Sequence, residues 1–197
     1  MNIFITGVCG FIGFNLARKF LNSNPKVTVY GIDNFDDYYS INLKKARLKI
    51  LRKFKNFKFE EVNIFKKKKL NVYFKNKKFD FVIHLAAQAG VRYSLVNPKK
   101  FIDNNLIGYI NLLDELKKIK PKKIFYASSS SVYGDSNNFP LKETESLNPK
   151  NIYGVSKKLN ESISKFYSTK FNLSMIGMRF FTIYGEWGRP DMFFLKL

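Results

Sequence analysis

The sequence predicts an α/β protein built on a doubly wound parallel sheet with helices on both faces. Short apolar runs alternate with amphipathic or charged segments along all 197 residues, and such alternation is typical of a parallel sheet. A glycine-rich turn directly follows the first apolar run. We find no internal repeat and no interdomain linker, so residues 1–197 are expected to form one domain with a full hydrophobic core.

The expected strands are short apolar or alternating runs, and they cover residues 2–6, 27–32, 57–62, 79–85, 123–127 and 173–178. The helical spacing of Ile12, Leu16 and Phe20 predicts the first helix. Further helices are expected over residues 41–54, 65–74, 98–118 and 151–169.

Composition supports a packed globule, because 45% of the residues are hydrophobic and 17% are aromatic. No uncharged apolar run reaches the roughly 18 residues that a transmembrane helix needs. The N-terminus lacks the basic region of a signal peptide. The single cysteine, Cys9, excludes an internal disulfide and fits a reducing cytoplasm, where we expect the protein. Within the glycine turn, a small cysteine is expected to pack rather than to act as a nucleophile.

The net charge of +20 could indicate a partner such as nucleic acid or a membrane surface. However, the lysines are spread through most segments. The densest cluster, residues 66–69 with Lys75, Lys77 and Lys78, is expected to form a solvated face beside a helix. We therefore expect no nucleic-acid or membrane partner, although a nonspecific polyanion binder stays an alternative. The charge should help to steer an anionic ligand to its site.

The glycine turn has the form Gly7-x-x-Gly10-x-x-Gly13 and joins a strand to a helix. Glycines allow a tight turn and close approach of a pyrophosphate, whose charge then lies at the helix N-terminus. Asp33 ends the next strand, about 20 residues further on, where an acid can accept hydrogen bonds from an adenosine ribose. An acid there also repels a 2′-phosphate, so the pattern predicts NAD rather than NADP. A plain tight turn is the alternative.

His84, the only histidine, lies inside an apolar strand, and no cluster of potential ligands accompanies it. We expect a packed or hydrogen-bonded core histidine. No metal site is predicted.

Tyr153 and Lys157 stand four residues apart on an expected helix, so they share one face. An ammonium group beside a phenol favours the phenolate, which predicts a lowered pKa for Tyr153 and a role as general base. The serine-rich stretch 128–131 follows an expected strand. Ligands bind beyond the carboxyl ends of strands in such sheets, where a hydroxyl can stabilise a reacting oxygen.

The glycine turn, the serine stretch and the Tyr/Lys pair together resemble the extended short-chain dehydrogenase/reductase family, which has a Rossmann-like fold. Within it, three stretches look like those of UDP-glucuronate 4-epimerases: residues 31–34, 84–94 and 179–192. The similarity runs over essentially the whole chain.

The resemblance implies catalytic roles for Ser129, Tyr153 and Lys157, with Ser128 and Ser130 as alternatives to Ser129. It implies NAD contacts from Gly7, Gly10, Phe11, Ile12, Gly13, Asp33, Asn34, Asn63, Ile64, Ala86, Ala87, Asn104, Tyr153 and Lys157. Arg189 would pair with the uronate carboxylate, and Arg92 and Thr182 would line the sugar site with Ser129.

The implied reaction is transient oxidation at C4 of a UDP-sugar, most simply UDP-glucuronate to UDP-galacturonate. Tyr153 would take the 4-hydroxyl proton while C4 passes a hydride to NAD⁺, and the 4-keto sugar would turn over before reduction. Ser131 stands where related dehydratases and decarboxylases have an acid, which favours epimerisation. A UDP-glucose 4-epimerase-like activity is the nearest rival, because only Arg189 firmly indicates a uronate.

Two departures from the family pattern bear on these expectations. Asn63 replaces the usual aspartate beside the adenine, which should weaken but not abolish recognition. Members of the family are much longer, so the chain is expected to be truncated, with the C-terminal substrate-binding part largely absent. A homodimer, a complementing C-terminal chain and an NAD-binding domain without turnover are therefore alternatives.

Overall fold

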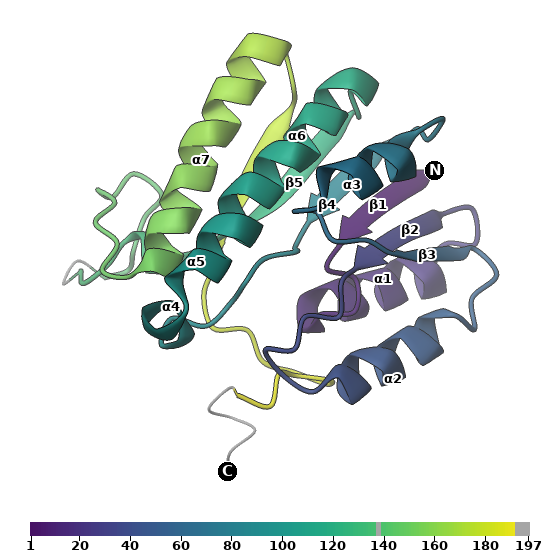
Figure 1. The fold of residues 1–197 in the computed structure, drawn as a ribbon, viewed down its shortest axis with the longest axis horizontal. Helices are drawn as coiled ribbons and strands as arrows, with labels where there is room; N and C mark the ends of the chain where they lie inside the picture. Colours follow the sequence, from purple (N-terminus) through teal and green to yellow (C-terminus); the bar gives the residue numbers. More distant parts are fainter. Residues whose placement is uncertain (137–138, 192–197) are drawn as a thin grey trace.

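A computed structural model describes residues 1–136 and 139–191, and it has a parallel sheet of six strands in the order β3-β2-β1-β4-β5-β6 (Figure 1). The strands are β1 Asn2–Thr6, β2 Thr28–Asp33, β3 Phe57–Glu61, β4 Phe81–His84, β5 Lys123–Ser129 and β6 Met175–Phe180. The helices are α1 Phe11–Ser23, α2 Ile41–Leu51, α3 Lys67–Phe74, α4 Tyr93–Val96, α5 Pro98–Phe101, α6 Gly108–Ile119 and α7 Ile152–Phe171. The predicted doubly wound fold is confirmed.

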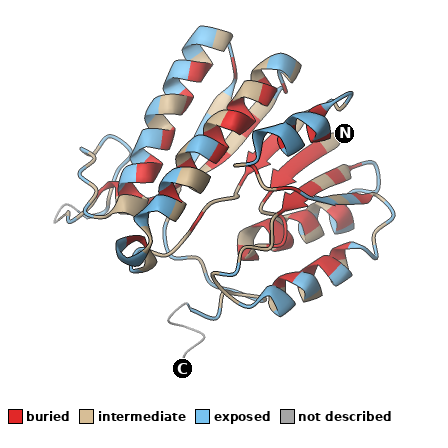
Figure 2. Cartoon of the chain, viewed as in Figure 1, coloured by how far each residue is buried: buried red, intermediate tan, exposed pale blue. Residues whose placement is uncertain are grey.

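Helices cover both faces of the sheet, as Figure 1 shows. Apolar side chains of α3, α6 and α7 pack with Phe4 on one face, whereas those of α1 and α2 pack with Ile5 on the other. The Phe4 ring stacks on that of Phe79 with centroids 4.8 Å apart. Figure 2 shows the resulting burial, with the helix faces that meet the sheet in red.

The expected helix over residues 98–118 is divided in the structure. The short helix α4 lies before the expected range. Within this range the short helix α5 comes first, and a π-helical turn over Ile102–Ile107 precedes α6. Within this turn Asn105 accepts a hydrogen bond from the Gln88 backbone N–H at 2.7 Å and donates to the Gln88 carbonyl at 3.1 Å. Such turns are frequent at functional sites, and this one fixes the loop that follows β4.

The boundaries of the last two strands differ from those expected. β5 continues to Ser129 because it pairs with β6 as far as Phe180. β6 begins at Met175 rather than at residue 173, because Asn172 adopts a left-handed conformation and the Leu173 N–H returns to the Ser168 carbonyl. The serine stretch therefore starts inside the sheet, which restricts the directions of its side chains.

Two single residues have the environments that the sequence predicted. Cys9 is buried, and burial raises the pKa of its thiol. The buried His84 ring stacks on Tyr109, and its Nδ1 lies 2.8 Å from the Thr6 hydroxyl. Desolvation lowers the pKa of His84 to about 3. Both residues serve packing.

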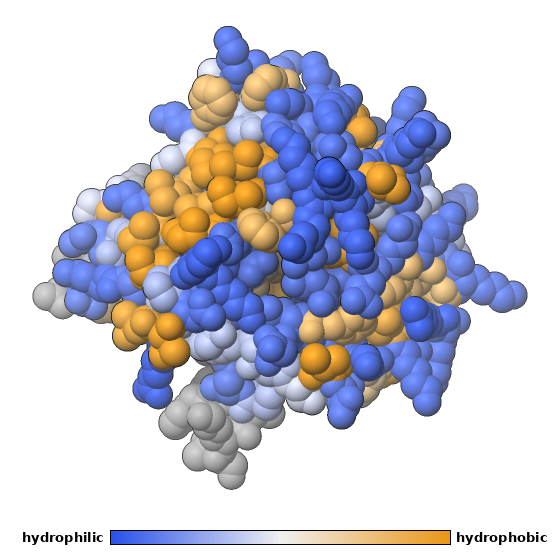
Figure 3. Space-filling view, in the orientation of Figure 1, coloured by the Kyte–Doolittle hydropathy of each residue, from blue (hydrophilic) through white to orange (hydrophobic). Residues whose placement is uncertain are grey.

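The surface carries much of the positive charge. Residues 66–69 are exposed at the start of α3, and hydrophilic side chains cover much of the face in Figure 3. In residues 1–136 and 139–191 no helix has both the length and the apolar character to span a bilayer. The same residues contain no group of three potential metal ligands.

Candidate active site

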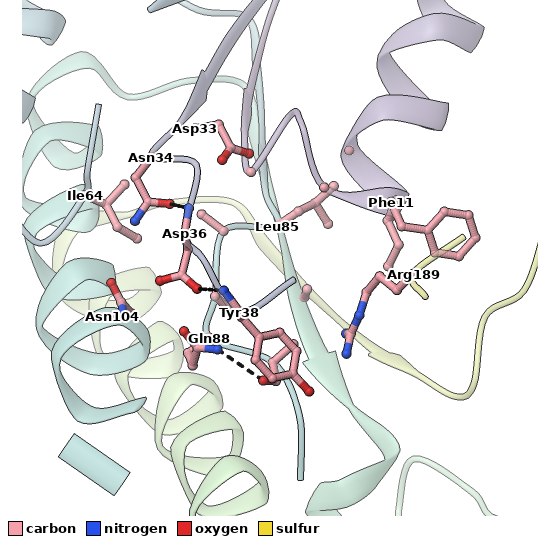
Figure 4. Close-up of a pocket in the computed structure, with 18 of the residues that line it drawn as sticks. Phe11, Asp33, Asn34, Asp36, Tyr38, Ile64, Leu85, Gln88, Asn104 and Arg189 are labelled. Atoms are coloured by element: carbon pink, nitrogen blue, oxygen red, sulfur yellow. Dashed lines mark hydrogen bonds between the residues drawn. The ribbon is translucent and has the colours of Figure 1, made fainter. Parts of the chain in front are cut away.

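A cavity of about 260 Å³ opens at the carboxyl ends of β1, β2, β4 and β5 (Figure 4). Cavities at this edge are where doubly wound sheets bind ligands. Every residue expected to contact NAD lines it: Gly7, Gly10, Phe11, Ile12, Gly13, Asp33, Asn34, Asn63, Ile64, Ala86, Ala87, Asn104, Tyr153 and Lys157. The fold thus brings residues from both halves of the sequence to one cavity.

The glycine turn after β1 leaves no room for side chains. Gly7 has a φ of +70°, and a Cβ atom there would lie 2.8 Å from the Ala86 backbone nitrogen. A Cβ at Gly13 would lie 2.3 Å from the Gly7 carbonyl oxygen. The following helix α1 has no side-chain cap and no acid in its first turn. Its first N–H groups can therefore bind an anion.

Asp33 lies at the end of β2, beside this turn. Its carboxylate accepts hydrogen bonds from the backbone N–H groups of Cys9, at 3.0 Å, and Phe35, at 2.9 Å. Burial raises the pKa of Asp33, although these two donors and Lys44 act in the opposite direction. Each carboxylate oxygen can accept further hydrogen bonds, so the geometry suits a ribose diol.

The opposite wall of the cavity comes from the segments after β3 and β4. Asn63 uses its side-chain oxygen to accept from the Phe65 N–H at 2.9 Å, which leaves its amide nitrogen as a donor. Ile64 is buried and offers an apolar surface. Figure 4 shows Ile64 and Asn104 on this side. An aromatic base could pack here and receive one hydrogen bond.

Tyr153 and Lys157 both project from α7, whose first turn is capped by the Asn151 side chain on the Gly154 N–H at 2.8 Å. Lys157 is buried, and its ammonium donates to the Ala127 carbonyl at 2.8 Å. It lies 6.0 Å from the centroid of the Tyr153 ring. The helix therefore sets the two side chains one turn apart in the cavity wall, as their spacing predicted.

The lowered pKa that the sequence predicted for Tyr153 is not found in this structure. Tyr153 is half-buried, and desolvation of its hydroxyl raises the pKa, although a hydrogen bond with Ser129 and the charge of Arg189 lower it. Lys157 is itself desolvated, which reduces its pKa to about 8. The prediction failed because burial acts on both partners, an effect that spacing alone does not reveal.

The structure distinguishes the serines of the 128–131 stretch. The Ser128 hydroxyl donates a hydrogen bond to the Glu161 carboxylate. The same carboxylate accepts hydrogen bonds from Nε and Nη2 of Arg179, each at 2.9 Å. Ser128 and Ser129 both line the cavity, and a side-chain hydrogen bond with Ser129 acts to lower the pKa of Tyr153. Ser130 does not line the cavity. These contacts favour Ser129 over Ser128 and Ser130 for the catalytic role that the resemblance implies.

The four residues expected at the sugar fall into two groups. Ser129 and Arg189 line the cavity, whereas Arg92 and Thr182 are exposed and do not. Arg189 forms a two-pronged pair with Asp191, with Nε 3.0 Å from Oδ1 and Nη2 2.5 Å from Oδ2. The guanidinium thus already binds a carboxylate. Met192, the last residue of the matching motif, lies outside the described residues.

Several lining residues were not predicted. The loop after β2 contributes Asp36, Tyr38 and Tyr39, and Lys44 of α2 reaches the cavity as well. The Tyr38 hydroxyl donates to Asp191 at 3.0 Å. The signal available in the sequence was the paired tyrosines followed by two basic residues on one helix face. From the sequence, only a helix over residues 41–54 is predicted here, and these residues have no predicted role.

Comparisons with known proteins agree with this geometry. Residues 3–196 match the model of the NAD dependent epimerase/dehydratase family. The chain is 43% identical to Protein CapI of Staphylococcus aureus, and the match covers 100% of this chain and 58% of that protein. It is 40% identical to UDP-glucuronate 4-epimerase 4 of Arabidopsis thaliana, over 100% of this chain and 45% of that one.

A solved structure is similar as well. The fold matches a UDP-glucuronic acid 4-epimerase from Bacillus cereus in complex with UDP-glucuronic acid and NAD, with a TM-score of 0.90 and 34% identity. This match covers 100% of the present chain and 62% of the other. The chain thus spans between 45% and 62% of the length of these relatives. It belongs to the NAD dependent epimerase/dehydratase family.

Proposed function

We propose that the protein takes part in NAD-dependent epimerisation of a UDP-sugar at C4, and that the sugar is a uronate, so that UDP-glucuronate and UDP-galacturonate interconvert. One observation carries the proposal: Ser129, Tyr153, Lys157 and Arg189 line the same cavity as the expected cofactor residues. The similarity to UDP-glucuronate 4-epimerases supports it.

The cavity fits NAD. The glycine turn excludes side chains and presents free N–H groups for a pyrophosphate. Asp33 would hold the adenosine ribose, and Ile64 with Asn63 would hold the adenine. When bound, NAD supplies a reversible two-electron oxidation of the sugar carbon.

The protein's own groups handle the proton. Tyr153 would remove the proton from the 4-hydroxyl oxygen, and Ser129 would orient that oxygen with a hydrogen bond. The pKa of Tyr153 is raised in this structure, so proton removal depends on positive charge nearby. Three cationic groups line the cavity with it, namely Lys44, Lys157 and Arg189. Burial of Lys157 strengthens its field, because little water screens it.

A carboxylate on the substrate is favoured by Arg189. The Asp191 carboxylate already binds this guanidinium in the two-pronged geometry that suits a uronate. UDP-glucose lacks such a group and would leave Arg189 paired with Asp191. The preference for UDP-glucuronate over UDP-glucose therefore depends on Arg189 and on its ion pair with Asp191.

The test begins with thermal unfolding of the 197-residue chain with and without excess NAD⁺. A ligand that binds only the folded state raises the midpoint, so an unchanged midpoint would refute the cofactor site. Conversion of UDP-glucuronate, followed by separation of the two uronates, tests the reaction. NAD binding without conversion would indicate a cofactor domain that needs further protein for turnover.

The partner could be a second copy of this chain or a chain that completes the sugar site. Light scattering of the purified chain distinguishes these arrangements. A mass of twice 23.1 kDa would support the homodimer.

A further inference from the structure

Arg47 of α2 places a cation in the protein interior, and the proposed reaction does not use it. Its side chain is fully buried, whereas arginine is rarely fully buried unless it is paired. Its four hydrogen-bond acceptors are all neutral, namely three backbone carbonyls and one phenol. A buried cation destabilises a fold unless its donors are satisfied. Both terminal nitrogens of Arg47 have acceptors, whereas its buried Nε has no hydrogen-bond partner among the described residues, so the contacts of the terminal nitrogens indicate the role of Arg47.

The acceptors come from separate parts of the chain. One terminal nitrogen donates to the Cys9 carbonyl at 3.0 Å and to the Tyr39 hydroxyl at 2.7 Å. The other donates to the carbonyls of Trp187 and Gly188, the latter at 3.2 Å. Cys9 lies in the glycine turn, and Gly188 directly precedes Arg189. One planar group therefore links the cofactor turn to the segment that carries Arg189.

The segment 185–191 depends on side chains of α1 and α2 for its position. It follows β6 after residues 181–184 and forms no helix or strand, and Trp187 has a φ of +62°. Figure 1 shows it in yellow, running to the start of α2. The Trp187 ring packs against Phe14 of α1 with centroids 5.5 Å apart. Glu186 pairs with Arg18 at 3.0 Å, but such exposed pairs contribute little.

We propose that Arg47 is a positioning residue that holds the segment 187–189 against the glycine turn by hydrogen bonds, so that the cofactor turn and Arg189 keep a fixed relative position. The link between the two segments follows from the hydrogen bonds of Arg47. Its consequence for substrate rests on the proposed function. A guanidinium suits the task because its rigid planar fork presents two separate terminal nitrogens to carbonyls on different segments, whereas a lysine has a single donor nitrogen at the end of a flexible stem.

The single tryptophan of the chain is Trp187, so its fluorescence reports on this segment alone. We compare the wild-type chain with Arg47→Met, which keeps a long side chain but donates no hydrogen bond. The proposal expects a red-shifted Trp187 emission and stronger quenching by acrylamide in the variant. Far-UV circular dichroism should stay unchanged. The matched control is Arg52→Met, at the exposed end of the same helix, where emission and quenching should equal those of the wild type.

Equal emission and quenching in Arg47→Met and the wild type would overturn the proposal. If Arg47→Met does not fold, Arg47→Lys decides, because it keeps the charge but offers one nitrogen in place of two. Acrylamide quenching of Trp187 in Arg47→Lys that is stronger than in the wild type, but weaker than that of a fully exposed tryptophan, would support the proposal. Wild-type quenching in that variant would overturn it.

The same samples separate this inference from the proposed function. The midpoint of unfolding is measured with and without NAD⁺. A wild-type chain that NAD⁺ does not stabilise would refute the cofactor site and leave the Trp187 comparison valid. Where UDP-glucuronate is converted, Arg47→Met should raise KM by about 10-fold or more with a smaller change in kcat, because Arg189 loses its orientation. A purely structural defect would instead lower the amount of active protein and leave KM unchanged.

Discussion

Replacement of Gly13 by alanine sets helix propensity against tertiary packing. Gly13 lies in the first turn of α1, where alanine would stabilise a free helix by up to about 1 kcal/mol. In the folded protein the added Cβ would lie 2.3 Å from the Gly7 carbonyl oxygen and 2.9 Å from the Val8 Cα. All of these neighbours are backbone atoms, so no side chain can turn away to make room.

The expected loss of stability in Gly13→Ala is the cost of the steric clash minus the gain in helix propensity. Forcing extra atoms into a packed site costs about 1–3 kcal/mol, and contact with rigid backbone belongs at the upper end of that range. After subtraction of the helix gain, we expect a net loss of about 2 kcal/mol. For a chain of this size the midpoint of unfolding should fall by roughly 4–8 °C.

The assay is thermal unfolding followed by circular dichroism, with and without NAD⁺. Gly10→Ala is the graded control, because its Cβ would lie 3.0 Å from the same Gly7 oxygen and meets no other backbone atom within 4 Å. Gly10→Ala should therefore lose less stability than Gly13→Ala. The NAD⁺ stabilisation should shrink in the same order, because both changes disturb the turn that approaches the pyrophosphate. A Gly13→Ala chain at least as stable as the wild type would refute this reasoning.

Three further predictions concern two residues of the site and the buried His84. Tyr153→Phe should abolish epimerisation while retaining the NAD⁺ shift in thermal unfolding, because only the hydroxyl is lost; wild-type turnover in the variant would disprove the role of Tyr153. Asp191→Asn should tighten UDP-glucuronate binding about 2- to 5-fold in calorimetry, because exposed ion pairs of this kind are worth about 0.2–1 kcal/mol, and weaker binding would show that Asp191 orients Arg189 instead. His84 has a pKa of about 3 in the folded chain against an ordinary 6.5, so the unfolded chain binds more protons between these values. Its contribution to stability should therefore fall as the pH drops below 6.5, by up to about 1.4 kcal/mol per pH unit. Urea unfolding at pH 7 and pH 5 should show a smaller loss for His84→Asn than for the wild type, and an equal loss would contradict the assignment.

Local patterns were sufficient to predict many of the residues that line the candidate cofactor cavity. Gly7, Gly13 and Asp33 could be predicted because a strand, a tight turn, a helix and a second strand follow one another within a short stretch, and their geometry depends on neighbours in sequence. Tyr153 and Lys157 could be paired because helical periodicity fixes their relative direction. The direction in which the pKa of Tyr153 shifts could not be predicted from the sequence, since it depends on how much water the folded site excludes.

The remaining part of the site depends on contacts between distant residues. From the sequence, Arg47 and Lys44 are only part of a predicted helix over residues 41–54. The structure buries both, because the loop after β2 and the segment 185–191 fold over them. Our preference for Ser129 over Ser128 as the catalytic serine depends on Glu161, one turn beyond Lys157, and on Arg179 of another strand.

The sequence by itself determined the alternation of strands and helices, the glycine turn and the Tyr153/Lys157 face. Each of these follows from backbone sterics and side-chain periodicity over a few residues. Only the tertiary structure decided which charged groups are buried and which partners they have. Burial and ion pairing depend on the three-dimensional approach of segments that the chain order keeps far apart, as between Cys9, Arg47 and Gly188.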